Sequence, residues 1–428
     1  MEEKLFQQRL ISRKGGQKMP TMRYTRRNMI GSMLVGAAAI SCLDNKVHAQ
    51  NANLATIDPK DHIKITKLET FPISRTRSVF LKVHTDAGIV GLGEPSLEGW
   101  APSVQAAVQE MGDYLIGKDP RQPVHHWQSI YRHGFYRGGP VLCSALSGID
   151  MALWDIKGKA LGVPVYELLG GPTRDKIRVY AGMGDVKRGI EQGFQAFKTG
   201  PGGRTPARLV DSPAWIENAV QNVARMREQG GPDIDIGIDF HGRFSVAMAQ
   251  KLIKALEPYD PMFIEEPIPA QNVDAMAELA KKTHIPIATG ERIFTKWGFR
   301  EILEKSAASL LQPDVTHCGG ITEMKIISGM AEAYYVGMMP HSKQGIIGTT
   351  ASMHVMASIP NFVIHEFATL GEGYIKEPFK VTDGYIPLPK GPGLGIELDE
   401  DSIRKEKNAP DWNFPELWDA YDGSVLDW

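Results

Sequence analysis

The chain is poor in cysteine and has almost no net charge. Its 428 residues include only Cys42, Cys143 and Cys318, too few for a disulfide framework, and no Cys-x-x-Cys or Cys/His spacing indicates a zinc site. The 48 Lys and Arg residues nearly balance the 50 Asp and Glu residues, so the formal net charge is -2. This balance argues against nucleic acid or an acidic membrane surface as a partner, because both attract strongly basic patches.

Long apolar runs, fixed-period repeats and low-complexity segments are also lacking. The apolar run from Met29 to Ile40 is too short to span a bilayer as a stable helix. The rest has an ordinary globular composition, with 42% hydrophobic and 23% charged residues. Its length favours two domains.

Residues 1–50 are typical of a targeting segment. Arg26 and Arg27 stand directly before the apolar run, and residues 47–49 offer a small-residue cleavage site. The pattern resembles a twin-arginine signal, so we expect export of the folded protein to the periplasm. Two alternatives stay open: a lipoprotein cleaved before a lipid-anchored Cys42, and a plain N-terminal extension.

Residues 62–170 predict a small α+β capping domain. Apolar and polar side chains alternate over residues 63–71, as in a half-buried strand, and residues 79–84 and 89–94 with the turn between them predict a hairpin or meander. Helical periodicity follows over residues 103–116, 121–133 and 142–161. Strands followed by helices are typical of an α+β domain.

Residues 171–370 predict a parallel (β/α) barrel. Short apolar strands end near Tyr180, Lys198, Asp239, Glu265, Glu291, Asp314, His341 and Glu366. From Asp239 onward these ends are 26, 26, 23, 27 and 25 residues apart, a spacing that suits βα units with right-handed crossovers. Eight such units close into a modified TIM barrel. We expect helices over residues 246–257, 273–283, 299–306 and 322–335, a long loop over 199–213, and a tail, 371–428, that packs on the capping domain.

Ionisable side chains end the late strands, which places them at one mouth of such a barrel. Asp239, Glu265 and Glu291 come from three successive strands. Three carboxylates make a hard oxygen site that suits Mg²⁺, with Mn²⁺ as an alternative. The sequence therefore predicts a divalent cation at this mouth.

Other polar residues are placed relative to this site by strand alternation. The alternation would point His241 to the same side as Asp239, and would turn Glu266 away into an ion pair. Asp314 and His341 end the next two strands. A carboxylate beside an imidazole fixes its tautomer and raises its basicity, so this pair is a candidate base.

Several motifs occur in a fixed order along residues 62–428. They are Gly134-Phe-Tyr-Arg-Gly-Gly-Pro, Gly148-Ile-Asp-Met-Ala-Leu-Trp-Asp-Ile-Lys-Gly-Lys, Ile238-Asp-Phe-His-Gly-Arg, Phe263-Ile-Glu-Glu-Pro, Ala288-Thr-Gly-Glu-Arg, Leu311-Gln-Pro-Asp, Gly319-Gly-Ile-Thr-Glu, Met339-Pro-His, Pro392-Gly-Leu-Gly and Asn408-Ala-Pro-Asp-Trp. Together they resemble the enolase superfamily, its mandelate-racemase subgroup and, within it, the D-galactonate dehydratase family.

This resemblance implies roles for the site residues. The implied ligands of one Mg²⁺ per subunit are Asp239, Glu265 and Glu291. It implies that His341, paired with Asp314, takes the α-proton of a sugar acid, and that His241 protonates the leaving hydroxyl. The sequence leaves open an exchange of the two histidine roles. Glu366 would hydrogen-bond the substrate carboxylate as it becomes an enediolate, a task for a protonated carboxyl.

Two segments depart from the family pattern. Many relatives carry Lys-x-Lys on the second strand, whereas here only Lys198 remains, as a substrate-binding residue. That argues against a racemase with two bases. Gly200 replaces an Asn of the galactonate family, and residues 342–346 replace Cys-Pro-Leu-Gly-Pro, so the sequence does not name the sugar acid.

The resulting hypothesis is a metal-dependent aldonic-acid dehydratase, a hydro-lyase that we expect to be a homo-oligomer. The capping domain would close over the barrel and offer Glu98, Trp100 and Arg137 to the sugar hydroxyls. Alternatives are an epimerase or anhydro-sugar-acid cycloisomerase using the same enediolate, or an exported sugar-acid-binding protein without catalysis. A barrel metallohydrolase is disfavoured, because the first strand has no His-x-His.

Overall fold

The computed structural model describes residues 61–73, 77–182, 185–202, 208–343, 345–405, 418–419 and 422–426. The predicted signal segment, with Arg26, Arg27 and Cys42, lies outside them. Within these ranges, no helix has both the length and the apolar character needed to cross a membrane.

The secondary structure falls into two groups. Before residue 170 the elements are β1 (Ile65–Ile73), β2 (Ser78–Thr85), β3 (Val90–Gly93), α1 (Ala101–Leu115), α2 (Pro123–His133), α3 (Pro140–Leu161) and α4 (Val165–Leu168). After it they are β4 (Lys176–Ala181), α5 (Val186–Glu191), β5 (Ala196–Thr199), α6 (Pro213–Gly230), β6 (Asp235–Asp239), α7 (Val246–Leu256), the 3-10 turn η2 (Glu257–Tyr259), β7 (Phe263–Glu265), α8 (Val273–Ala280), β8 (Ile287–Thr289), α9 (Thr295–Glu304), β9 (Leu310–Leu311), α10 (Gly320–Ala333), β10 (Gly337–Met338), α11 (Ile346–Ala357), β11 (His365–Phe367), β12 (Tyr385–Pro387) and α12 (Glu400–Lys405).

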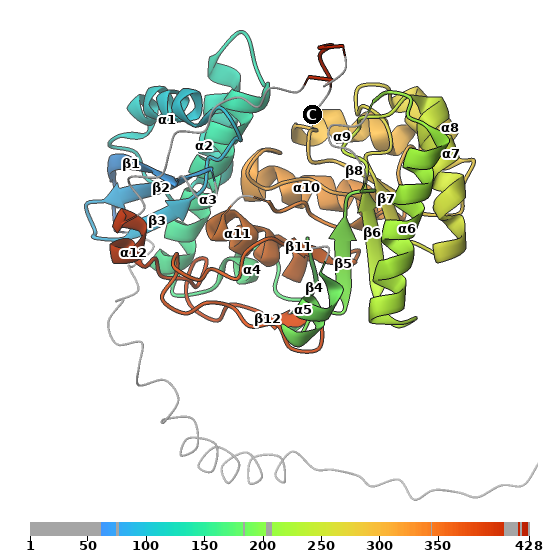
Figure 1. Cartoon of the computed structure of the whole chain (residues 1–428). Helices are drawn as coiled ribbons and strands as arrows, with labels where there is room; N and C mark the ends of the chain where they lie inside the picture. The colour runs from blue at the N-terminus through green and yellow to red at the C-terminus, as the bar shows by residue number, and fades with distance from the viewer. Residues whose placement is uncertain are drawn as a thin grey trace, which may run out of the picture. The chain divides into compact units, whose positions relative to one another are not determined.

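The first group forms an antiparallel sheet, β1-β2-β3, packed on α3 (Figure 1). Strand β3 lies directly on this helix. A Cβ atom at Gly91 would stand 2.3 Å from the carbonyl oxygen of Ala152, and one at Gly93 would stand 2.0 Å from that of Gly148. The two glycines are therefore required by the close approach of strand and helix.

The second group forms a closed barrel of parallel strands in the order β10-β9-β8-β7-β6-β5-β4-β11. The ring closes beside β10, where the Met338 N–H donates to the Asn361 carbonyl (2.8 Å) and the Val363 N–H donates to the Met338 carbonyl (2.9 Å). The predicted barrel is confirmed, with one difference. The last strand, β11, leads to β12, which pairs antiparallel with β4, and residues 368–384 form no helix.

Helix α3 also joins the cap to the barrel. The carboxylate of Asp150 accepts hydrogen bonds from the backbone N–H (2.9 Å) and the hydroxyl (2.6 Å) of Thr322 on α10, and the Trp154 indole donates to the same hydroxyl (2.9 Å). Burial raises the pKa of Asp150 to about 7, although the hydrogen bonds from Thr322 oppose the shift. The contact between α3 and α10 thus contains a carboxyl group whose protonated form is stabilised by burial.

The described part of the tail contacts both groups. The Leu394 N–H donates to Asp155 of α3 (2.7 Å), and Glu400 of α12 forms an ion pair with Lys82 of β2. Strand β12 instead lies on the barrel, beside β4. The tail thus ties the cap to the outside of the barrel.

The raised pKa of Asp150 predicts that the stability of the folded protein depends on pH. Its folded pKa of about 7 lies above the ordinary value of 3.8, so the folded protein keeps a proton that the unfolded chain has already released, and stability falls as pH rises from about 4 to about 7. In Asp150→Asn the amide can still bond both groups of Thr322 without titrating. The free energy of unfolding of wild type should therefore fall by about 2–4 kcal/mol relative to that of the variant between pH 4 and pH 8.

Urea unfolding of both proteins across this range measures the effect. Asp113→Asn, on an exposed position of α1, serves as the control and should show no such difference from wild type. Parallel stability curves for wild type and Asp150→Asn would contradict the assignment.

Candidate active site

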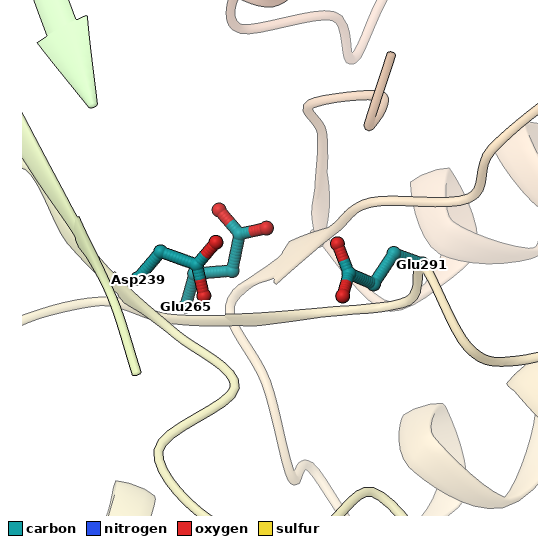
Figure 2. Close-up of side chains that lie close together, drawn as sticks. All are labelled: Asp239, Glu265 and Glu291. Atoms are coloured by element: carbon teal, nitrogen blue, oxygen red, sulfur yellow. The ribbon is translucent and has the colours of Figure 1, made fainter. Parts of the chain in front are cut away.

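Three carboxylates meet where β6, β7 and β8 end. Asp239 and Glu265 are register partners on neighbouring strands, and Glu291 follows β8 by two residues. One carboxylate oxygen from each lies within 4.8 Å of the others; Asp239 and Glu265 are buried, and Glu291 is partly buried. Figure 2 shows the groups turned toward a common space. The structure therefore brings together the three residues predicted as metal ligands.

Lys198, on β5, reaches into the same cluster. Its ammonium nitrogen lies 2.9 Å from Glu366, 3.0 Å from Glu265 and 3.4 Å from Asp239. Burial alone would lower the pKa of Lys198, but the charges of Glu265 and Glu366 raise it well above its ordinary value. In this arrangement Lys198 is therefore a cation.

His341 and Asp314 form the predicted pair. The His341 Nδ1–H donates to Asp314 Oδ2 (2.7 Å), and Nε2 lies 3.0 Å from Glu291 Oε2. Burial would lower the pKa of His341, yet Glu291, Glu366 and Asp314 raise it well above its ordinary value. Burial would likewise raise the pKa of Asp314, yet it is held well below its usual range by two histidines, His317 and His341.

Glu366, on β11, completes the wall opposite the metal-ligand candidates. Its Oε2 accepts the backbone N–H of Ser342 (3.0 Å) and lies 3.8 Å from His341 Nε2. Burial opposes ionisation, but Lys198 and His341 lower the pKa of Glu366. In this arrangement Glu366 is anionic and acts as an acceptor.

His241 reaches the site by a route that strand alternation does not describe. Strand β6 ends at Asp239, and His241 has a left-handed φ of 52°. Its Nε2 still lies 3.1 Å from Asp239 Oδ2, while its Nδ1 lies 3.1 Å from an Arg243 nitrogen. Because a guanidinium only donates, Nδ1 accepts and Nε2 carries the proton. Burial lowers the pKa of His241, so the ring is a neutral donor.

Three of the predicted strand ends lie in loops instead. The paired strands stop at Thr289, Leu311 and Met338, so Glu291, Asp314 and His341 follow the strands by two or three residues. At Gly290 the chain has a φ of 151°, and a Cβ would stand 2.6 Å from the Gln312 backbone. Glycine is therefore required at this position, where the chain leaves β8 close to the backbone that follows β9.

Glu266 forms an ion pair, as the sequence predicts, although it follows the end of β7 with a left-handed φ of 39° that strand alternation does not describe. Its carboxylate pairs with the Arg292 guanidinium at 2.7 Å. Burial and the charge of Glu291 raise the pKa of Glu266 to about 8, against the lowering effect of Arg292. This carboxyl is therefore engaged by Arg292 beside the cluster.

The three predicted cap contacts occupy different places. The charge of Glu98 acts on the pKa of His317, so its loop lies beside the barrel mouth. Trp100 is 48% exposed in front of α1. Arg137 is exposed; it donates to the Gly134 carbonyl (3.4 Å) and lines a cavity of about 590 Å³ among α1, α2 and α3. Among the described residues, the hydrogen bond of Arg137 is made within the cap, and the three predicted roles stay predictions.

Two residues near the site were missed by the sequence analysis. Glu94, at the end of β3, accepts the N–H groups of Gly345 and Gly348 at the start of α11. His317 lies in the turn after β9, and its Nδ1 is 2.9 Å from the Ser144 hydroxyl on α3. An acid at a strand end and a histidine three residues after Asp314 were the available signals. Their partners lie 251 and 173 residues away in the chain, which no local pattern shows.

The cluster fits a divalent cation. Four carboxylates, those of Asp239, Glu265, Glu291 and Glu366, face the cationic Lys198 and His341, which leaves two negative charges when all are ionised. Glu265 Oε2 is buried and has no hydrogen-bond partner within the described ranges. An unpaired buried carboxylate oxygen is costly, and hard oxygen ligands suit a hard cation.

Comparison with known proteins identifies the family. Residues 51–170 match the mandelate racemase / muconate lactonizing enzyme N-terminal domain, and residues 184–402 match the enolase C-terminal domain-like family. The chain belongs to the enolase superfamily. Its N-terminal match places it in the mandelate racemase and muconate lactonizing enzyme group.

Individual relatives agree with this assignment. D-galactonate dehydratases of Ralstonia nicotianae and Pectobacterium atrosepticum are each 46% identical, over 86% of this chain and 100% of the relative. An enolase from Agrobacterium radiobacter, solved with Na and L-malate bound, gives a TM-score of 0.79 at 30% identity over 85% of this chain and 99% of its own. A member of the enolase superfamily from Salmonella Typhimurium gives 0.76 at 33% identity, over 80% and 98%.

The carboxylate cluster predicts a metal-dependent stability. Mg²⁺ should raise the unfolding temperature of the wild-type protein, and at a hundredfold excess over Kd its binding should add about 2.7 kcal/mol. Glu265→Gln should lose most of this gain, because the amide replaces a buried oxygen ligand.

Glu266→Gln is the matched control, a neighbouring buried carboxyl that is paired with Arg292 and is not one of the three candidate ligands. Each protein is freed of metal by chelation and dialysis, and Mg²⁺ is then added. Glu266→Gln should show the same rise in unfolding temperature as wild type. An equal response in Glu265→Gln and wild type would contradict the metal role of Glu265.

Proposed function

We propose that this chain is a sugar-acid dehydratase, a hydro-lyase that takes the α-proton of an aldonic acid and eliminates the β-hydroxyl as water. The observation that carries the proposal is the His341–Asp314 pair, whose second ring nitrogen, Nε2, lies 3.0 Å from Glu291 of the carboxylate cluster. The relatives named D-galactonate dehydratase, and the enolase structure solved with the hydroxy acid L-malate, support the substrate class.

The α-proton of a carboxylate is too weakly acidic for an imidazole acting alone. A Mg²⁺ ion held by Asp239, Glu265 and Glu291 would stabilise the negative charge that develops on the substrate carboxylate. His341 then needs a neutral Nε2 to accept the proton. Its present ion pair with Glu291 favours the imidazolium, so the base form needs the charge of Glu291 to be neutralised by another cation.

Glu366 and Lys198 would bind the other end of the developing enediolate. An incoming substrate carboxylate adds a negative charge beside Glu366, and like charges raise a carboxyl pKa. A protonated Glu366 can donate a hydrogen bond to the substrate, while the Lys198 ammonium, 2.9 Å away, attracts the same group. Both interactions strengthen as the second negative oxygen forms.

The leaving hydroxyl needs a proton, because hydroxide is a poor leaving group. His241 offers one from Nε2–H at the opposite edge of the cluster from His341. The C2–H bond gives its electrons to the new C2–C3 double bond, the C3–O bond breaks, and water leaves. The enol then tautomerises to a 2-keto-3-deoxy acid.

Elimination is favoured over epimerisation by the state of Lys198. A two-base epimerase needs a neutral base on the second face of the α-carbon. Lys198 is paired with Glu366 at 2.9 Å, a contact that a metal ion on Asp239 and Glu265 would leave in place, and Thr199 and Gly200 after it carry no base. We therefore propose one-sided proton removal followed by loss of water.

A panel of hexonic, pentonic and aldaric acids tests the proposal. With Mg²⁺ in D₂O, the wild-type enzyme should form a 2-keto-3-deoxy acid from at least one of them, measured by NMR. His341→Asn should lose both this product and the exchange of the substrate α-proton. His241→Asn should lose the product but retain the exchange, because it acts after proton removal.

His284→Asn, whose side chain is 65% exposed, is the control histidine and should behave as wild type. If exchange of the α-proton survives in His341→Asn and stops in His241→Asn, the roles of base and acid are the reverse of those proposed. Exchange without any keto acid from the wild-type enzyme would replace dehydration by epimerisation or cycloisomerisation. Absence of both would refute the enzyme proposal for these substrates.

A further inference from the structure

His317 is an imidazole at the barrel mouth that the chemistry above does not use. It lies in the turn after β9, where its backbone N–H donates to the Asp314 carbonyl (3.0 Å), and its side chain is only 7% exposed. Its ring is held from the cap side by Ser144 of α3, whose hydroxyl lies 2.9 Å from Nδ1. The ring therefore links α3 of the cap to the turn that carries Asp314.

The charged groups that act on this ring belong to the candidate site and the cap loop. Burial lowers the pKa of His317; Asp314, Glu291 and Glu98 raise it, and His341 lowers it further. These groups are the partner of the base, a metal-ligand candidate, an acid of the cap loop and the base itself. With the backbone hydrogen bond to Asp314 and the contact with Ser144, they place His317 where the cap meets the loop that carries Asp314.

One ring nitrogen remains free in this position. The Nδ1 atom is engaged by Ser144, while Nε2 makes no hydrogen bond to the described part of the chain and keeps access to solvent. If the Ser144 hydroxyl donates to Nδ1, Nε2 carries the hydrogen and is a donor. A buried imidazole with one fixed nitrogen and one free nitrogen is suited to reading a hydroxyl group.

We infer that His317 Nε2 hydrogen-bonds a hydroxyl on the distal part of the sugar-acid chain, beyond C3, and that Ser144 positions the ring for this contact. The inference rests on the proposed function, because it assigns the carboxylate end to the metal cluster and the distal end to the cap side. His317 is then a specificity-determining residue that selects acids with a hydroxyl at C4 or beyond. It takes no part in proton transfer at C2 or C3.

The experiment must distinguish the loss of a contact to the distal hydroxyl from a general disturbance of the site. Two ligands are compared: a hexonic acid, and the three-carbon acid glycerate, which has no C4 hydroxyl. In the presence of Mg²⁺, calorimetry measures Kd and turnover measures kcat/KM for each of them. His317→Ala loses a hydrogen bond and leaves a substrate hydroxyl unsatisfied. For the hexonic acid, its Kd should therefore rise, and its kcat/KM should fall, by about tenfold to a hundredfold. The glycerate Kd should stay within about twofold of wild type, since no distal group is lost.

Two further variants separate contact from positioning. His317→Gln keeps an amide donor and should recover part of the hexonate affinity. Ser144→Ala leaves the imidazole in place but unfixed, and should give a smaller loss than His317→Ala, confined to the same substrate. The Mg²⁺-induced rise in unfolding temperature should be unchanged in all three variants, which shows that the metal cluster is intact.

The outcomes distinguish this inference from the proposed function. If the wild-type enzyme binds hexonates without forming a keto acid, the dehydratase proposal fails, and the Kd of His317→Ala still decides the role of His317. Equal losses on hexonate and glycerate, or no loss on either, overturn the inference. Failure of the wild-type protein to bind any hexonate overturns both.

Discussion

The central constraint on this structure is the repulsion among four carboxylates that converge on one buried point. Parallel strands deliver Asp239, Glu265 and Glu366 to the same barrel mouth, and the turn after β8 adds Glu291. Lys198 contacts three of them, and the remaining negative charge suits a divalent cation. The carboxylate charges raise the pKa of His341, while the cationic Lys198 and His341 lower that of Glu366, so the proton positions depend on the charge in the cluster.

The cap is joined to the barrel by buried polar contacts close to this cluster. Glu94 binds the first turn of α11, a few residues after His341, and burial raises its pKa to about 7. Ser144 holds His317, while Asp150 holds the start of α10. Helix α3 supplies two of these contacts, so the domain that would recognise the substrate is also attached to the loops that carry the base pair.

The barrel and the main acidic residues could be predicted because they depend on local patterns. Spacing near 26 residues indicated the βα units, and the strand ends indicated Asp239 and Glu265, whereas Asp314 and His341 follow their strands by three residues. Helix α11 lacked such a signal, because it is buried at every position and shows no polar face. The left-handed backbone of His241 depends on the loop after β6, which alternation ignores. The partners of Glu94 and His317 depend on domain packing, which a single sequence does not specify.

The most direct test of this account is the position of a bound cation. Crystals grown with Mn²⁺ and a sugar acid should show one anomalous peak among the carboxylates of Asp239, Glu265 and Glu291. The Lys198 ammonium should then contact Glu366 or the substrate carboxylate, since a cation would take over its contacts with Asp239 and Glu265. A peak elsewhere, or an occupied substrate site with no metal at these three carboxylates, would contradict the central claim.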